Sequence, residues 1–143
     1  MKVLLDANVI ISGLRFAGTS RRIIDLCNQG YIVGFTSDEA IDEVEEALLS
    51  SKFGVLPEEW ETIEEALRDT VAVVTVVVFP VVKSLRDTRD LHILAAAQMC
   101  EANIIVSGDN DLLVLREYRS TPIMNPANFL VLYGSDENLK ADP

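Results

Sequence analysis

The stretch VLLDANVIIS, residues 3–12, places a single carboxylate between two apolar runs. Residues 2–5 predict a short buried strand, because the run is nearly continuous in apolar residues and shows no alternation with polar ones. Asp6 ends this strand, and a carboxylate in that position needs either a polar partner or a function. We expect Asn8 and Ser12 to lie in the loop beyond the strand, close to Asp6.

The remainder of the chain alternates short apolar runs with amphipathic segments. Further strands are predicted at residues 32–35, 71–79, 104–106 and 123–124. Three helices are predicted with both ends: one from Thr19 or Ser20 to Gly30, one from Asp90 to Cys100, and one over 111–118. Three more are predicted by their starts alone: one capped by Thr36 or Ser37, one beginning at Pro57, and one beginning at Pro126. This alternation predicts an α/β domain with a largely parallel central sheet of about four to five strands, covered by helices on both faces.

The composition is that of one folded domain. The chain has 143 residues, of which 49% are hydrophobic, so we expect a single domain over 1–133 and a polar tail over 134–143. The apolar runs are too short to cross a bilayer, and no secretory segment is evident at the start. Cys27 and Cys100 are predicted to be core thiols of a reducing compartment, so we expect a cytoplasmic protein. The single histidine, His92, excludes a histidine-rich metal site.

The negative charge is concentrated in one region. The net charge is −11, and residues 38–69 alone hold twelve acids against two bases. The other 111 residues hold eleven acids and ten bases, so they are almost neutral. The total charge therefore does not exclude a nucleic-acid ligand. The acidic region either faces a basic partner or forms a solvated surface, and the sequence leaves both possibilities open.

Four acids are expected at strand and helix ends. Asp6 and Asp109 follow predicted parallel strands, whose carboxyl ends form the usual ligand site of such a sheet. Asp90 opens a helix, and Glu43 lies in a helix with small residues nearby. Taken singly, Asp90 resembles a helix cap, Asp109 an Asx turn and Glu43 an exposed helix face.

Taken together, these carboxylates would need a counter-charge. A divalent cation supplies it, and an all-oxygen ligand set favours Mg²⁺ or Mn²⁺ over zinc. Two such ions could activate a water and stabilise the leaving oxygen of a phosphodiester.

Several motifs occur in an order that resembles a known family. They are VLLDANVIISG (3–13), SDEAIDEV (37–44), DLHILAAA (90–97), VSGDNDLL (106–113) and the closing IMNPANFL (123–130). The set is similar to PIN domains, especially the VapC-like toxins of bacterial and archaeal toxin–antitoxin pairs. The resemblance implies a three-layer α/β/α domain in which Asp6, Glu43, Asp90 and Asp109 are the catalytic acids that bind Mg²⁺ or Mn²⁺. Asp42 is a weaker alternative to Glu43, and Asp87 is a weaker alternative to Asp90.

The resemblance also implies supporting residues and partners. Asn8, Ser12, Ser107 and Asp111 match polar positions beside the acids. Arg15 and Arg89 are among eight bases near the motifs that could contact phosphates. The implied activity is hydrolysis of single-stranded or loop RNA by a homodimeric toxin that a cognate antitoxin inhibits. A PIN nuclease of RNA maturation or decay, and a PIN-like module that does not cleave, are the alternatives; the complete set of acids counts against the latter.

Overall fold

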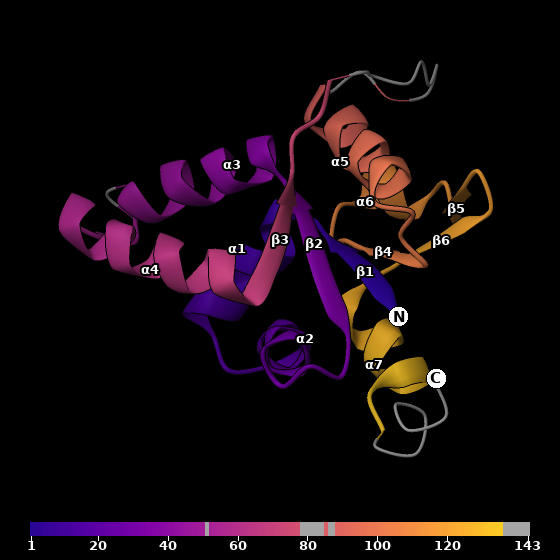
Figure 1. Cartoon of the computed structure of the whole chain (residues 1–143), viewed down its shortest axis with the longest axis horizontal. Helices are drawn as coiled ribbons and strands as arrows, with labels where there is room; N and C mark the ends of the chain where they lie inside the picture. Colours follow the sequence, from indigo (N-terminus) through magenta and orange to yellow (C-terminus); the bar gives the residue numbers. More distant parts are fainter. Residues whose placement is uncertain (51, 78–84, 86–87, 136–143) are drawn as a thin grey trace.

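The centre of the molecule is a mostly parallel sheet (Figure 1). The computed structural model describes residues 1–50, 52–77, 85 and 88–135. Within these residues the sheet has six strands in the order β3-β2-β1-β4-β6-β5, and only β5 runs antiparallel to its neighbour. The strands are β1 (Lys2–Leu5), β2 (Val33–Ser37), β3 (Val71–Val74), β4 (Ile104–Val106), β5 (Glu117–Tyr118) and β6 (Thr121–Met124).

Seven helices in the described residues surround this sheet. They are α1 (Ala7–Arg15), α2 (Thr19–Asn28), α3 (Asp38–Leu49), α4 (Pro57–Thr70), α5 (Thr88–Met99), α6 (Asn110–Leu113) and α7 (Pro126–Tyr133). Figure 1 shows α2 and α7 side by side on one side of the sheet and α5 with α6 on the other. The predicted α/β architecture with helices on both faces is therefore confirmed. None of these helices is long and apolar enough to cross a membrane.

Strand β1 lies in the middle of the sheet and positions the end of the first motif. Val3, Leu4 and Leu5 have no exposed surface, as expected for an apolar run paired on both edges and covered on both faces. The chain leaves β1 towards β2 on one side, whereas β4 lies on the other side. Connections therefore diverge between β1 and β4, which is where open parallel sheets form a ligand crevice.

The segment after Asp6 is a helix, so the prediction of a loop there was wrong. Asp6 is the N-cap of α1, and its side chain accepts a hydrogen bond from the amide of Ala7 at 2.7 Å. Val9 and Ile10 turn into the core, and Gly13 allows a close approach to α2. A Cβ at Gly13 would lie 2.4 Å from Cδ1 of Ile24 and 3.1 Å from the backbone oxygen of Ser20, so a larger residue would crowd the contact between α1 and α2.

Two elements end earlier in the structure than predicted. Strand β3 stops at Val74, and residues 78 and 79 of the predicted strand lie outside the described residues. The predicted helix over 111–118 is only the short helix α6, followed by β5. Arg116 has a positive φ of 63°, which ends the helical region and starts the hairpin. Strand β5 of this hairpin was not predicted, and it brings the sheet to six strands instead of the predicted four to five.

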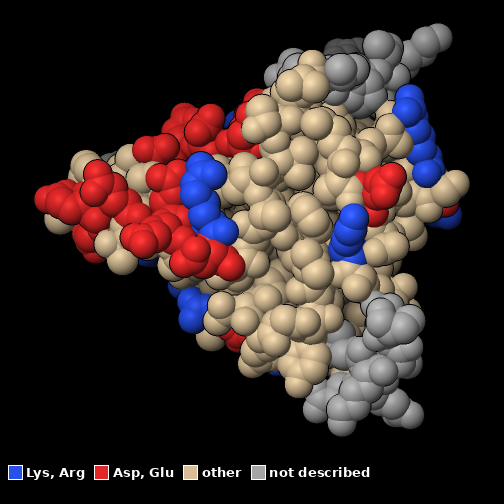
Figure 2. Space-filling model, viewed as in Figure 1, with Lys and Arg blue, Asp and Glu red and all other residues tan. Residues whose placement is uncertain are grey.

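Helices α3 and α4 form a projecting pair that we call the acidic arm. Ser37 caps α3, where its hydroxyl accepts a hydrogen bond from the amide of Ala40 at 2.9 Å, whereas Thr36 donates to the carbonyl of Leu5. Trp60 and Leu67 are buried on the inner side of α4, whereas Ile63 of the same helix is partly buried. Figure 2 shows acidic side chains gathered over this pair on the face that it draws.

Both cysteines are buried and free, as predicted. Burial raises the pKa of the Cys27 thiol to about 12 and also raises the pKa of Cys100. These thiols therefore remain protonated and pack as small apolar groups.

Candidate metal centre

A pocket of about 460 Å³ lies at the carboxyl edge of the sheet. Its walls include acids from four separate segments: Asp6 after β1, Glu43 from α3, Asp90 from α5, and Asp109 after β4. All four acids of the predicted quartet thus line the same pocket. This convergence follows from the topology, because β1 and β4 are neighbours and α3 and α5 contact each other at that edge.

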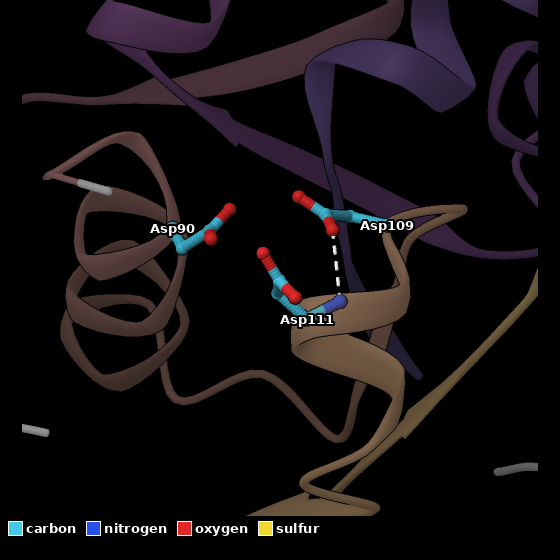
Figure 3. A group of neighbouring side chains, drawn as sticks. All are labelled: Asp90, Asp109 and Asp111. Carbon is cyan, nitrogen blue, oxygen red and sulfur yellow. Dashed lines mark hydrogen bonds between the residues drawn. The ribbon is translucent and has the colours of Figure 1, made fainter. Parts of the chain in front are cut away.

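Three aspartates within this region form a tight cluster (Figure 3). One carboxylate oxygen from each of Asp90, Asp109 and Asp111 lies within 4.8 Å of the others. The side chains point towards one another from α5, the loop before α6, and α6 itself. The amide of Asp111 donates to Oδ1 of Asp109 at 2.9 Å, which fixes the relative position of these two residues.

The chemistry of this cluster fits a hard divalent cation. Its donors are carboxylate oxygens, the ligands that Mg²⁺ and Mn²⁺ prefer, and three negative charges this close repel one another without a cation. Asp111, predicted as an additional acid, belongs to this cluster. Among the described residues, Asp6 and Glu43 line the pocket beside the cluster without belonging to it.

Asp6 is held by three hydrogen bonds at the base of the pocket. It is only 6% exposed, and it accepts from the amide of Ala7, from the Asn8 side chain at 3.1 Å and from the Ser107 hydroxyl at 2.7 Å. Burial raises the pKa of Asp6, the hydrogen bonds oppose that rise, and the charge of Asp109 adds to it. A cation in the pocket would favour the ionised carboxylate.

Asn8 and Ser107 join the end of β1 to the loop after β4. The Asn8 side chain donates to Asp6 and accepts from the amide of Gly108 at 2.9 Å. The Ser107 oxygen donates to Asp6 and accepts from the amide of Asp109 at 3.0 Å. Asn8 thus links Asp6 to Gly108, and Ser107 links Asp6 to Asp109. Together these hydrogen bonds fix the spacing between Asp6 and Asp109.

Glu43 and Arg89 form the opposite wall. Nε of Arg89 lies 3.4 Å from Oε1 of Glu43, and the Arg89 side chain is 60% exposed. Both residues line the pocket, so Arg89 brings a positive charge to the mouth of an acidic site. This position suits contact with a phosphate group.

Other predicted residues lie away from the pocket walls. Ser12 and Arg15 are on α1 but are not among the residues that line the pocket. Arg21, one of the bases near the first motif, donates to the carbonyls of Gly13 and Leu14 and so caps the end of α1. Its guanidinium has a structural partner.

His92 has a role that the sequence did not predict. Its ring is buried between α5 and the first turn of α3, where Nε2 contacts the Glu39 carboxylate and Nδ1 lies 3.8 Å from Asp38. This contact ties α5, which carries Asp90, to α3, which carries Glu43. The histidine is two residues from Asp90, but nothing in the local sequence indicates its acidic partners.

Comparison with known proteins agrees with this fold. The family model described as PIN domain matches residues 2–111, and the chain therefore belongs to the PIN domain family. Among solved structures, the PIN domain of human SMG5 is 12% identical, with a TM-score of 0.50 over 90% of this chain and 96% of that one. This likeness concerns the fold alone. The search of curated proteins found no match.

Proposed function

We propose that this PIN domain is a Mg²⁺- or Mn²⁺-dependent endoribonuclease that hydrolyses single-stranded RNA. PIN domains are generally nucleases, and the observation that carries the proposal is the cluster of Asp90, Asp109 and Asp111, of which the first two line a pocket that also contains Asp6. A bound divalent ion would make a water more acidic and offset the negative charge of the phosphodiester. The expected products are a 5′-phosphate and a 3′-hydroxyl.

The residues of the chain divide this work between them. Asp90, Asp109 and Asp111 would hold the ion, and Asp6 would complete or orient its surroundings while Ser107 and Asn8 keep Asp6 in place. Arg89 would bind a phosphate at the mouth of the pocket. The chain has one histidine, so it lacks the histidine pair of a metal-free ribonuclease that attacks through the 2′-hydroxyl.

We further propose that the enzyme is the toxin of a toxin–antitoxin pair and acts as a homodimer. The support is the resemblance of the five motifs to VapC-like toxins. The acidic arm, with twelve acids and two bases over 38–69, offers a surface of the charge that a basic antitoxin segment would need.

The activity is tested by incubating the purified chain with labelled single-stranded and hairpin RNA in Mg²⁺, in Mn²⁺ and in EDTA. Cleavage is expected with either metal, in unpaired regions, and mapping should find 5′-phosphate ends. Chelation should abolish the reaction, and added metal should restore it. Cleavage that persists in EDTA, or products with 2′,3′-cyclic phosphate ends, would contradict the proposal.

The toxin role needs a separate experiment in cells. Expression of the wild-type chain should arrest growth, and co-expression of a small neighbouring gene with a DNA-binding head and a basic tail should restore it. A catalytically impaired Asp90→Asn chain serves as the control and should not arrest growth. Normal growth with a chain that cleaves RNA in vitro would favour a role in RNA maturation or decay.

A further inference from the structure

The pocket extends away from the aspartate cluster along a groove between α1 and α3. On the α1 side it is lined by Ile11, and on the α3 side by Ala47 and Ser50. Arg15 is four residues after Ile11 on the same helix, so it lies one turn farther along the same face. Phe53 is tied to the end of α3, since its amide donates to the carbonyl of Ser50 at 3.2 Å.

Two cations gather around one aromatic ring beyond the residues that line the pocket. The guanidinium carbon of Arg15 lies 4.6 Å from the centre of the Phe53 ring, and Nζ of Lys52 lies 5.4 Å from it. Both charged side chains are exposed, whereas the ring is half-buried. Phe53 therefore holds Arg15 of α1 and Lys52 of the α3–α4 connection in one place, by contacts that leave their charges open to solvent.

The charge along the groove changes in a way that fits a polynucleotide strand. The groove begins at the aspartates, where a metal ion would bind the scissile phosphate, and then passes the apolar side chains of Ile11 and Ala47. Glu46 on the same wall disfavours a phosphate in this middle section. Arg15 and Lys52 follow beyond the residues that line the pocket, although Lys52 is one of only two bases in the strongly acidic region 38–69.

We propose that Arg15 and Lys52, positioned by Phe53, bind a backbone phosphate of the RNA strand on one side of the scissile bond. The seven residues from Asn8 to Arg15 rise about 10 Å along α1, which corresponds to about three phosphates at the spacing of a stacked strand. The bound phosphate therefore lies a few linkages from the cleaved one. This inference rests on the proposed ribonuclease function and adds a second anchoring point for its substrate.

The direct test replaces single phosphates of the RNA by neutral methylphosphonates. Fluorescein-labelled single-stranded RNAs about ten nucleotides long would each carry one neutral linkage, with the cleavage position set by prior mapping. Binding is measured by fluorescence anisotropy with Mg²⁺ in the full chain carrying Asp90→Asn, which prevents cleavage. Neutralising one linkage, a few positions from the cleaved one, should weaken binding about tenfold. This is the loss expected when a charge-assisted hydrogen bond is removed.

Variants then assign that linkage to the two cations. Arg15→Gln and Lys52→Gln should each weaken binding of the unmodified RNA, and the double variant should no longer respond to the neutral linkage. The double variant should also reduce the slope of log K against log salt by about 0.7, the value for one phosphate of a single strand. Arg68→Gln, which removes the other base of the region 38–69 from α4, is the matched control and should leave affinity and slope unchanged.

Phe53 is tested as a positioning residue. Phe53→Leu keeps an apolar side chain but removes the ring, and it should weaken binding, whereas Phe53→Tyr should restore it. If Phe53→Leu lowers the melting temperature but leaves the salt slope and the methylphosphonate pattern intact, the ring only joins α1 to α3.

The outcomes separate this inference from the function on which it rests. A wild-type enzyme that cleaves RNA but gives a flat methylphosphonate scan outside the scissile linkage would overturn the phosphate site alone. A chain that shows no metal-dependent cleavage would overturn the proposed reaction. The phosphate site would still be supported if that chain binds a phosphate that the Arg15→Gln, Lys52→Gln double variant does not bind.

Discussion

The pocket and the acidic arm both collect carboxylates, but they hold them in opposite ways. In the pocket, Asp6 and Asp90 are 6% and 5% exposed and come from segments far apart in the sequence. On the arm, Glu61 and Glu65 are exposed and follow each other at helical spacing above a buried apolar side. Buried, hydrogen-bonded carboxylates such as these favour a bound cation, whereas exposed acids are screened by water and salt. The surroundings of a carboxylate therefore indicate its role better than the local charge count.

The largest contrast is expected from removing one carboxylate charge in each region. Asp90→Asn should lower the rate of RNA cleavage by more than about 100-fold, since loss of even an outer partner of a metal ligand costs about 10–100-fold. Glu61→Gln, the matched variant on the arm, should leave the rate unchanged. The measurement is initial cleavage rate at saturating Mg²⁺, with far-UV circular dichroism to verify folding. If Asp90→Asn and Glu61→Gln changed the cleavage rate equally, the pocket acids would not differ in function from the acids of the arm.

A smaller effect is expected from the residue that supports Asp6. Ser107→Ala removes a hydrogen bond to the Asp6 carboxylate and another from the amide of Asp109. Activity at low Mg²⁺ should fall about 10–100-fold, and a higher metal concentration should recover part of the loss. Thr70→Ala, which removes a hydroxyl from the end of α4, is the control.

The same variant has a predicted pH dependence. The hydrogen bond from Ser107 favours the ionised form and lowers the pKa of Asp6, so its loss should raise that pKa further. Because the proposed reaction needs the ionised carboxylate of Asp6, the acid limb of the pH–rate profile should move to higher pH in Ser107→Ala. An acid limb that stays in place would show that Asp6 does not control it.

The smallest effect is expected from neutralising the arm itself. The double variant Glu61→Gln, Glu65→Gln removes a like-charge pair four residues apart on α4. The melting temperature should rise by about 1–2 °C at low ionic strength, and the gain should vanish at about 1 M salt. RNA cleavage should stay at the wild-type rate. A large loss of stability would mean that these acids have partners within the fold.

The strands of the fold could be predicted well because their signals are local. The apolar run of β1, the short run of β4 and the cap at Ser37 each depend on a few adjacent residues. The helix after Asp6 was missed although its signal was present, since an N-capping aspartate precedes apolar residues at helical spacing. Strand β5 and its turn into β6 were missed because Arg116, Arg119 and Ser120 adopt positive φ values that sequence would assign to glycine or asparagine.

The sequence could indicate which residues lie at the candidate site, but it could not indicate which of them contact one another. Motif resemblance and position at strand ends brought out Asp6, Glu43, Asp90 and Asp109, and the pocket contains all of them. The tighter grouping of Asp111 with Asp90 and Asp109 depends on the direction of α6, which only the folded chain defines. The contacts of His92 with Asp38 and Glu39 depend in the same way on how α5 crosses α3.

The hydrogen bond from Ser107 to Asp6 has a consequence for synthesis and folding. It joins residues 101 positions apart, and the aspartate cluster extends to Asp111. A growing chain therefore carries Asp6 from the beginning but cannot assemble the pocket until β4 and α6 have been made and paired with β1. Contacts of such long range form slowly compared with local helices, so any activity of the pocket should be among the last properties to appear as the protein is produced.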